Sequence, residues 1–407
     1  MIRRAHTVLV RLCAATIMSM SVWFSAAAVA PFLQRDWSLT PTETAWLITA
    51  VQIGFVTGTL LSAFLVLADR VETRWLFAVS SLASALANAA LVTADGFAWA
   101  LPLRFLTGAL QAGVYPPAMK LASSWFREGR GFAVGALIGA LTIGTAIPHT
   151  FGLLTQADEV TGLSWQPTVL AASLLAVLGG LLVLFGVEDG PYAERASRFE
   201  PKAVIDILTW KGVRLANIGY IGHMWELYAM WAWTPVYLHE IFSSHYGPSG
   251  AAVAAGASFA VIAMGAPGSL VAGYLADRLG RTAVVVAALL ISGSCCLLAG
   301  SVEHSSPALV LGLFGVWGFA VIADSAQFST MVTELAPRHL LGTALTLQTS
   351  LGFLMTTISL QGLPVVRAHL GWSEAFALLA LGPVVGIVAM WRLRHTEEAK
   401  KIALGKK

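Results

Sequence analysis

Four ionisable side chains lie within otherwise apolar stretches of this sequence, and they are the residues best suited to do chemistry. Glu226 and Asp324 are carboxylates, Arg104 is a guanidinium, and His223 lies one helical turn before Glu226. A charge at the centre of a bilayer costs at least about 2.5–3.5 kcal/mol, so such residues normally face a cavity or a partner. Their positions predict a functional site inside a membrane.

Proton transfer is the chemistry that these side chains suit best. Removal from water favours the protonated form of a carboxylate, whereas a neighbouring cation favours its charged form. A carboxylate that moves between two such environments takes up a proton on one side of a membrane and releases it on the other. Glu226 with His223 is the first candidate and Asp324 the second. Arg104 either pairs with an acid or holds an anionic substrate.

The alternative to proton transfer is that these residues are fixed polar contacts between helices, satisfied by hydrogen bonds. We take this structural interpretation for His149, which follows Pro148 in an apolar stretch.

Metal and enzyme chemistry lack the residues they need. The pair His223-x-x-Glu226 could ligate a metal, but a di-metal helical site needs further Glu-x-x-His partners, which the sequence does not supply. The sequence also has no His-Glu-x-x-His, no Gly-x-Ser-x-Gly and no phosphate-binding Gly-x-x-x-x-Gly-Lys. We therefore expect no metal, no cofactor and no enzymatic activity, and an ion gradient rather than ATP as the energy source.

The composition indicates that lipid is the solvent around these residues. Of 407 residues, 57% are hydrophobic and 12% are charged, whereas soluble proteins carry about 25% charged residues. So few charges cannot cover a soluble protein of this size. Cys13, Cys295 and Cys296 all lie in apolar runs, which indicates small core residues rather than a disulfide framework or a zinc site.

Twelve stretches are long enough to cross a bilayer core, which takes roughly 20 helical residues. Three of them contain one intramembrane charge each: 97–119, 215–238 and 307–333. The others carry no formal charge: Leu12–Gln34, Ala45–Ala68, Trp75–Ala94, Gly131–Ala157, Val160–Val187, Ile241–Ala276, Thr282–Val302, Leu340–Val366 and Ala375–Trp391. The sequence therefore predicts an all-α membrane protein with twelve transmembrane helices.

The order of the spans predicts two six-helix halves, 1–187 and 215–391, joined by a cytoplasmic linker, 188–214, and followed by a basic tail, 392–407. Within the linker, Pro201–Trp210 is either a short amphipathic helix on the membrane surface or a solvated segment. With the N-terminus in the cytoplasm, 22 of the 25 Lys and Arg residues fall on cytoplasmic segments. We expect a multi-pass protein of the bacterial inner membrane with both termini in the cytoplasm.

A repeated tetrapeptide marks the two halves. Leu-Ala-Asp-Arg occurs at 67–70 and again at 275–278, and the second copy continues as far as Gly280-Arg281. The repeat of six spans is typical of secondary transporters. A tight turn needs Gly280, Asp277 can accept hydrogen bonds from helix N-terminal amides, and two arginines can pair with acids across the halves.

These segments resemble motifs of the major facilitator superfamily. Residues 273–281 resemble its cytoplasmic loop motif, and Arg104–Gly113 resembles its fourth-span pattern. The resemblance implies that fold, with two pseudo-symmetric halves. It also implies a cytoplasmic gating role for the matching residues, which are Asp69, Arg70, Arg74, Gly273, Asp277, Arg278, Gly280 and Arg281. The first copy departs from the pattern, with Leu65 at the leading glycine and Glu72 at the turn glycine.

Two further segments, Asn217–Pro235 and Ala323–Phe328, resemble a twelve-span bacterial branch grouped loosely with nitrate/nitrite porters. Nitrate porters carry an arginine in the second span and another in the eighth. Both spans lack arginine here, so we do not expect nitrate as the substrate.

Aromatic and amide side chains are the candidates for a substrate cavity. They are Trp23, Gln111, Tyr115, Trp225, Tyr228, Gln327 and Gln348. The predicted function is a monomeric secondary active transporter that moves a small solute by alternating access, driven by protons and surrounded by membrane lipid, with no nucleic-acid partner. The alternatives are a facilitative uniporter and a non-transporting membrane receptor, which would still bind its ligand without the midplane carboxylates.

Overall fold

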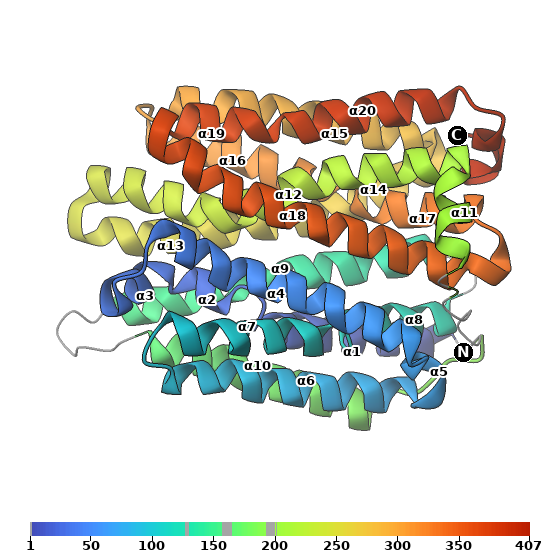
Figure 1. Ribbon diagram of the computed structural model, residues 1–407, viewed down its shortest axis with the longest axis horizontal. Helices are drawn as coiled ribbons and strands as arrows, with labels where there is room; N and C mark the ends of the chain where they lie inside the picture. The colour runs from blue at the N-terminus through green and yellow to red at the C-terminus, as the bar shows by residue number, and fades with distance from the viewer. Residues whose placement is uncertain (1, 127–129, 157–164, 193–199, 201) are drawn as a thin grey trace.

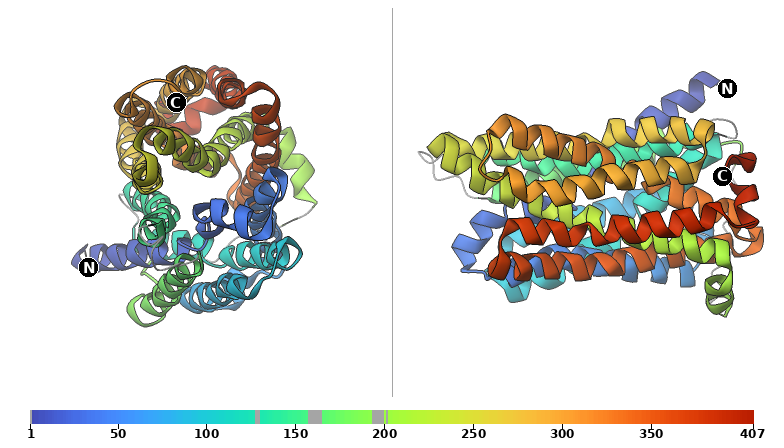
Figure 2. Two further views of the ribbon diagram at one scale, coloured as in Figure 1. Left: turned by 90° about the vertical axis from the view of Figure 1, so that its left-hand side faces the viewer. Right: turned by 90° about the horizontal axis from the view of Figure 1, so that it is seen from above.

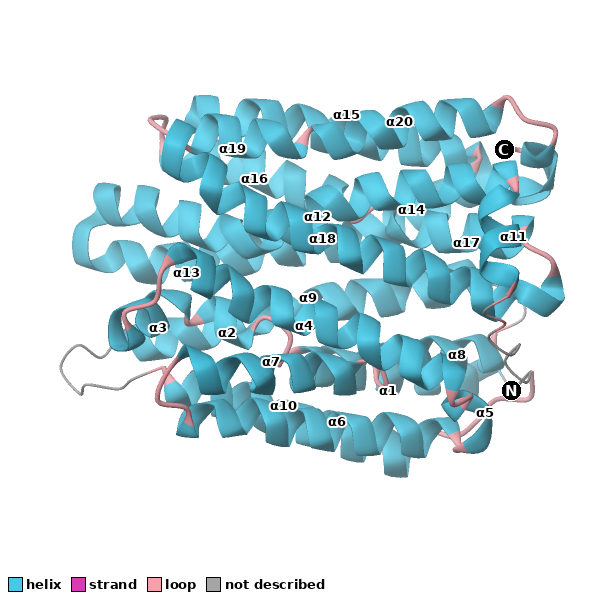
Figure 3. Cartoon of the chain, in the orientation of Figure 1, coloured by secondary structure: helices cyan, strands magenta, loops and turns pink. Residues whose placement is uncertain are grey.

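The computed structural model describes residues 2–126, 130–156, 165–192, 200 and 202–407, and among these residues every regular element is a helix. Long helices run side by side along one axis, and the two chain ends lie at the same end of the bundle (Figures 1 and 3). We call this the terminal end and the opposite one the distal end.

The first half contains six members of the bundle, several of them interrupted. Its helices are α1 (Ile2–Met20), α2 (Ser25–Ala28), α3 (Ala30–Trp37), α4 (Pro41–Phe64), α5 (Leu67–Arg70), α6 (Thr73–Ala89), α7 (Phe97–Gln111), α8 (Tyr115–Trp125), α9 (Arg130–Gln156) and α10 (Gln166–Gly186). The helix α4 begins with a full capping box, in which Thr40 and Glu43 satisfy each other's backbone amides.

The second half follows the short helix α11 (Ala203–Thr209), which lies inside the linker segment where sequence left two interpretations open. Its helices are α12 (Lys211–Tyr246), α13 (Gly250–Ala263), α14 (Gly265–Leu279), α15 (Arg281–Ala299), α16 (Pro307–Val321), α17 (Ser325–Leu335), α18 (Leu341–Leu370), α19 (Trp372–Leu379) and α20 (Leu381–Arg394). A 3-10 segment, η5 (Glu398–Gly405), folds back at the terminal end.

Within the described residues each predicted span overlaps one helix or consecutive helices, so the all-α membrane fold is confirmed. The bounds differ at two places, because α1 begins at Ile2 and α12 continues to Tyr246, past the predicted start of the eighth span. In the described part of the chain, nine helical members are by themselves long and apolar enough to cross a membrane. The remaining members of the bundle do not meet this criterion of length and apolarity, each for a local reason. The first span is interrupted after Met20, the fourth is interrupted after Gln111, and α12 carries several polar residues. The facing ends of the fifth and sixth predicted spans, at 157–164, lie outside the described residues.

The two halves meet through symmetric helix pairs (Figure 2). The second span, α4, packs on the eleventh, α18, while the fifth span, α9, packs on the eighth, α13 and α14. A two-fold operation that exchanges the halves converts one pair into the other. The fourth and tenth spans are also interrupted at matching places, after Gln111 and after Val321.

Close packing in the first half depends on glycines that face a neighbouring backbone. A Cβ atom on Gly108 of α7 would lie 2.0 Å from the carbonyl oxygen of Val51 in α4, and one on Gly54 would lie 2.0 Å from that of Phe105. Small residues at such points let helix backbones approach closely.

We expect Gly108→Val to destabilise the protein by about 1–3 kcal/mol or more, because the added side chain would force α4 and α7 apart. The midpoint of thermal unfolding in detergent measures this. Gly312→Val is the matched control, because Gly312 lies in α16 with nothing within 4 Å of an added Cβ. An equal loss in both variants would mean that helix propensity, and not helix contact, controls the effect.

Candidate functional site

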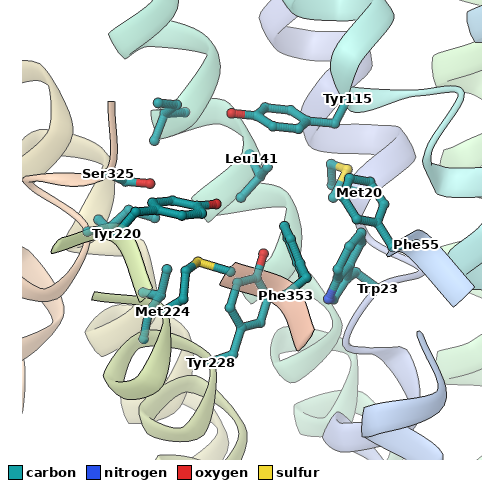
Figure 4. A pocket seen from close by; sticks show the side chains of 13 residues that line it. Met20, Trp23, Phe55, Tyr115, Leu141, Tyr220, Met224, Tyr228, Ser325 and Phe353 are labelled. Carbon is teal, nitrogen blue, oxygen red and sulfur yellow. The ribbon is translucent and has the colours of Figure 1, made fainter. Parts of the chain in front are cut away.

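A small cavity lies between the two halves near the middle of the bundle (Figure 4). Its volume is about 40 Å³, enough for only a few water-sized positions. Both halves contribute to its wall, which consists of Met20, Trp23, Phe55, Tyr115, Ile138, Leu141, Tyr220, Met224, Leu227, Tyr228, Ile322, Ser325 and Phe353. The cavity is therefore small, and aromatic side chains make up much of its wall.

The polar groups of this cavity are neutral. Figure 4 shows the hydroxyl groups of Tyr115, Tyr220 and Tyr228 directed into the cavity from different sides. The indole Nε1 of Trp23 has no hydrogen-bond partner among the described residues. Among those residues, no Lys, Arg, Asp or Glu lines the cavity. The wall can therefore stack against a flat ring and donate hydrogen bonds, but it supplies no charge of its own.

Ring contacts between the halves close the cavity on its distal side. Trp23 lies 5.7 Å from Phe353 and 6.1 Å from Tyr228 between ring centroids, and Phe24 lies 6.1 Å from Trp231. Farther toward the distal end, the amide of Gln361 in α18 donates to Thr49 in α4 at 3.0 Å. These contacts join the first half to the second.

Arg104 braces the interruption in the first span. One guanidinium nitrogen donates to the Val22 carbonyl at 3.2 Å and to Asn88 Oδ1 at 2.8 Å, and the other donates to the Trp23 carbonyl at 2.6 Å. The side chain is only 1% exposed and does not line the cavity. None of these partners is an acid. Arg104 therefore satisfies the carbonyls that the interrupted helix leaves free, and it holds Trp23 in the cavity wall.

His223 and Asp324 form a buried pair directly behind the cavity wall. Their Nδ1 and Oδ1 atoms are 2.8 Å apart and both side chains are 1% exposed. The two atoms are not aligned as a linear hydrogen bond, and His223 Nε2 and Asp324 Oδ2 have no hydrogen-bond partner among the described residues. Asp324 immediately precedes Ser325 of the wall, and the His223 ring stacks 6.0 Å from that of Tyr220.

Glu226 lies in a separate buried site inside the second half. Its carboxylate accepts hydrogen bonds from Trp317 Nε1 at 2.6 Å, from Ser292 Oγ at 2.9 Å and from Cys296 Sγ at 3.2 Å. The carboxylate is 1% exposed and does not line the cavity. It joins α12 to α15 and α16.

The sequence-based pairing of His223 with Glu226 differs from the contacts in the structure, where His223 meets Asp324 instead. Residues three apart on a helix point about 60° from each other, so each can face a different neighbour. The role expected of Cys296 also changes, because it is a hydrogen-bond donor to a carboxylate and not only an apolar core residue.

Three of the residues expected in the cavity line it: Trp23, Tyr115 and Tyr228. Four others do not, and each of them has one polar atom bonded elsewhere. Gln111 donates to the Ser19 carbonyl, Gln348 to the Phe328 carbonyl and Trp225 to the Leu378 carbonyl, while Gln327 accepts from Arg281.

Several cavity residues escaped the sequence analysis, among them Phe55, Tyr220 and Phe353. No sequence signal separates them from ordinary core aromatics. His149 lines a second small cavity of about 30 Å³ with His239 near the distal end, and its Nε2 has no partner among the described residues.

The gating motif of the second half forms its contacts within that half. Arg281 donates through Nε and a terminal nitrogen to Glu334 of α17, at 3.0 and 2.9 Å, and its other terminal nitrogen is 3.4 Å from Asp277. The guanidinium of Arg278 lies 4.1 Å from the centre of the Tyr274 ring. Gly280, with φ of +98°, forms the turn between α14 and α15, and Gly273 lies within α14.

The pairing across the halves that the sequence suggested for these arginines is therefore absent among the described contacts of this conformation. In the first copy of the motif, Arg70 ends α5, and Arg74 pairs with Glu72 at 2.6 Å. The side chain of Asp69 lies outside the described part of the structure.

A bundle of membrane-crossing helices in two symmetric halves, with a closed cavity between them and buried titratable groups beside it, defines a membrane transport protein. The chain belongs to the Major Facilitator Superfamily, whose family model matches residues 12–360 and 243–407. It is a multi-pass membrane transporter of small solutes and not an enzyme.

Three comparisons illustrate the relationship. The chain is 26% identical to the niacin transporter NiaP of Acinetobacter baylyi, over 73% of this chain and 74% of that protein. It is 21% identical to the hexuronate transporter of Escherichia coli, over 93% and 91%. A solved bacterial homologue of the human lysosomal transporter Spinster has the same fold, with a TM-score of 0.69 at 14% identity, over 98% of this chain and 97% of that one.

We expect Arg104→Gln to lower the free energy of unfolding by about 1–3 kcal/mol or more, because the Trp23 carbonyl would lose its guanidinium donor in a dry interior and the Val22 carbonyl would keep only Ser25 Oγ. Thermal unfolding in detergent measures this loss. Arg35→Gln is the control, because Arg35 is exposed and pairs only with its neighbour Asp36. If Arg104→Gln unfolds at the same temperature as the wild type, the hydrogen bonds of Arg104 do not contribute to stability.

Proposed function

We propose that this chain is a proton-coupled secondary transporter that moves a small aromatic carboxylate across the bacterial inner membrane by alternating access. The observation that carries the proposal is the buried His223–Asp324 pair, which adjoins an aromatic cavity through Tyr220 and Ser325. The cavity is complete within one chain, so we propose that a monomer performs transport.

Charge balance explains why a proton would accompany the substrate. An isolated anion in a dry cavity without a cation is strongly disfavoured. The His223–Asp324 pair is neutral overall when it holds one proton, and a second proton makes the pair positive. A protonated pair behind the wall would compensate an anion inside the cavity. The proton and a monocarboxylate would therefore bind and leave together.

The aromatic wall supports a flat, ring-shaped substrate. The NiaP relatives are named for niacin or nicotinamide, which carry one aromatic ring and one polar substituent. Rings of Trp23, Phe55 and Phe353 can stack on such a molecule, while the tyrosine hydroxyl groups and the Trp23 indole donate to its polar group. A hexuronate has several hydroxyl groups, and this wall offers few partners for them.

The arrangement of contacts supports alternating access with the terminal end in the cytoplasm. The distal side is closed by ring contacts between the halves, whereas the Arg281 contacts at the terminal end stay within one half. The positive residues concentrate on segments of the terminal end, as expected for the cytoplasmic side. The small cavity would expand when the halves rock apart.

Two alternatives from the sequence remain open to test, a facilitative uniporter and a non-transporting receptor. Glu226 also remains a rival to His223–Asp324 as the coupling site, because it is equally buried. Its three donors favour a fixed role in joining helices.

We expect Asp324→Asn and His223→Gln to abolish nicotinate accumulation driven by a pH gradient in liposomes and to slow nicotinate exchange at equal pH, because the altered pair compensates the anion less well. Loss of the proton site removes coupling without removing the cavity. A uniporter would show no gradient-driven accumulation even in the wild type, and a receptor would show binding without either flux.

Glu226→Gln is the matched carboxylate variant in the same experiment. We expect it to keep gradient-driven accumulation and to unfold at lower temperature, because a glutamine amide would place a donor against three donors. If Glu226→Gln loses accumulation while Asp324→Asn keeps it, Glu226 is the coupling residue and the assignment to His223–Asp324 is wrong.

We expect Trp23→Leu and Phe353→Leu each to weaken nicotinate binding roughly 2- to 10-fold, since an aromatic contact contributes about 0.5–1.5 kcal/mol beyond its area. Titration calorimetry on the purified protein measures this. Trp225→Leu is the control, because Trp225 faces α19 and not the cavity. Preference for glucuronate over nicotinate would contradict the proposed substrate class.

A further inference from the structure

A third and larger cavity opens at the terminal end, away from the central cavity. Its volume is about 210 Å³, compared with about 40 Å³ for the central one. It lies where the start of α12 meets the end of α17 and the η5 segment. Its wall consists of Trp210, Gly212, Val213, Leu335, Pro337, Glu398 and Lys401.

Two opposite charges face this cavity without satisfying each other. The Oε2 atom of Glu398 is buried and has no hydrogen-bond partner among the described residues. Lys401 forms no ion pair within the described part of the chain. The neighbouring charges behave differently, because Glu397 and Lys400 pair with each other on the exposed surface. A carboxylate and an ammonium group are thus available to one ligand.

The cavity lies beside a helix that is suited to the membrane surface. The helix α11 runs across the bundle axis at the terminal end (Figure 1), so it lies along the plane that a membrane surface would take. Two of its apolar side chains are uncovered, with Ile205 72% exposed and Leu208 36% exposed, whereas Ile207 is buried against the bundle. Trp210 directly follows α11 and lines the cavity. An exposed apolar helix face beside an indole is typical of the lipid interface.

We propose that this cavity binds the phosphoethanolamine headgroup of a membrane lipid. The ammonium group of the lipid pairs with Glu398, the phosphate pairs with Lys401, and the glycerol region contacts Trp210, Val213 and Leu335. The cavity, at about 210 Å³, suits a compact headgroup with its acyl chains outside.

Such a lipid would connect the linker helix to the gating motif. The η5 segment that carries Glu398 also donates from the Ala403 amide to Glu334 at 3.2 Å, and Glu334 is the acceptor of Arg281. Its Lys406 side chain donates to the Asp277 carbonyl at 2.7 Å. A headgroup that holds η5 in place therefore supports the contacts of Arg281.

Native mass spectrometry of the full chain, purified in mixed micelles of three lipids, tests this proposal. The lipids share acyl chains and differ in headgroup: phosphatidylethanolamine, phosphatidylcholine and phosphatidylglycerol. We expect preferential retention of phosphatidylethanolamine, because a trimethylated ammonium has no N–H to donate to Glu398. Glu398→Gln and Lys401→Gln should each reduce its retained fraction about tenfold or more, since each removes a charge-assisted hydrogen bond.

The matched controls are Glu397→Gln and Lys400→Gln, which remove the same charges one residue away and should leave retention unchanged. Thermal unfolding of each variant shows that the fold is kept. Equal retention of the three lipids, or equal losses in the control variants, would overturn the proposal. Binding of soluble O-phosphoethanolamine without retention of the lipid would overturn the assignment to a lipid and identify a soluble ligand instead.

Discussion

The shortage of water inside a membrane is the constraint on which the rest of this structure depends. Every polar group that a helix interruption exposes there needs a partner from the protein itself. The first span is interrupted after Met20, and Arg104 meets that need by donating to the Val22 and Trp23 carbonyls. The same contact directs Trp23 into the cavity wall. Arg104, whose charge would otherwise be costly in the membrane, thus permits an irregular backbone beside the central cavity.

The second half contains two buried carboxylates, and their hydrogen-bond partners differ. Glu226 is surrounded by three donors, which satisfies the group and joins three helices. Asp324 meets only His223 and keeps an oxygen without a partner among the described residues. This contrast in hydrogen bonding is the basis of our proposal that His223–Asp324, and not Glu226, couples transport to protons.

The symmetry of the halves extends to their packing but not to their chemistry. The helix pairs α4–α18 and α9–α13/α14 are exchanged by the same two-fold operation. The two copies of the gating motif differ in sequence and in contacts. In the second half, Gly280 allows a tight turn and Arg281 reaches Glu334. In the first half, Glu72 stands at the position of Gly280 and pairs with Arg74. The charged contacts of this motif therefore lie mainly in the second half, next to η5 and the cavity of Glu398.

The amino-acid sequence by itself determined the membrane class, the succession of the spans, the family and the small set of buried charges. These features depend on local composition and spacing: apolar runs of membrane length, a repeated tetrapeptide and four ionisable residues where lipid should be. The tertiary structure alone decided which groups meet. His223 and Glu226 are near neighbours in sequence but point to different helices, and Trp317, Ser292 and Cys296 reach Glu226 from segments far along the chain. From sequence, Gln111, Gln327 and Gln348 could each line a cavity, because they are polar residues within spans. Only the packing shows that each amide forms a hydrogen bond away from the cavity. Side-chain direction around a helix depends on the neighbouring helices, and that information is not contained in spacing along one chain.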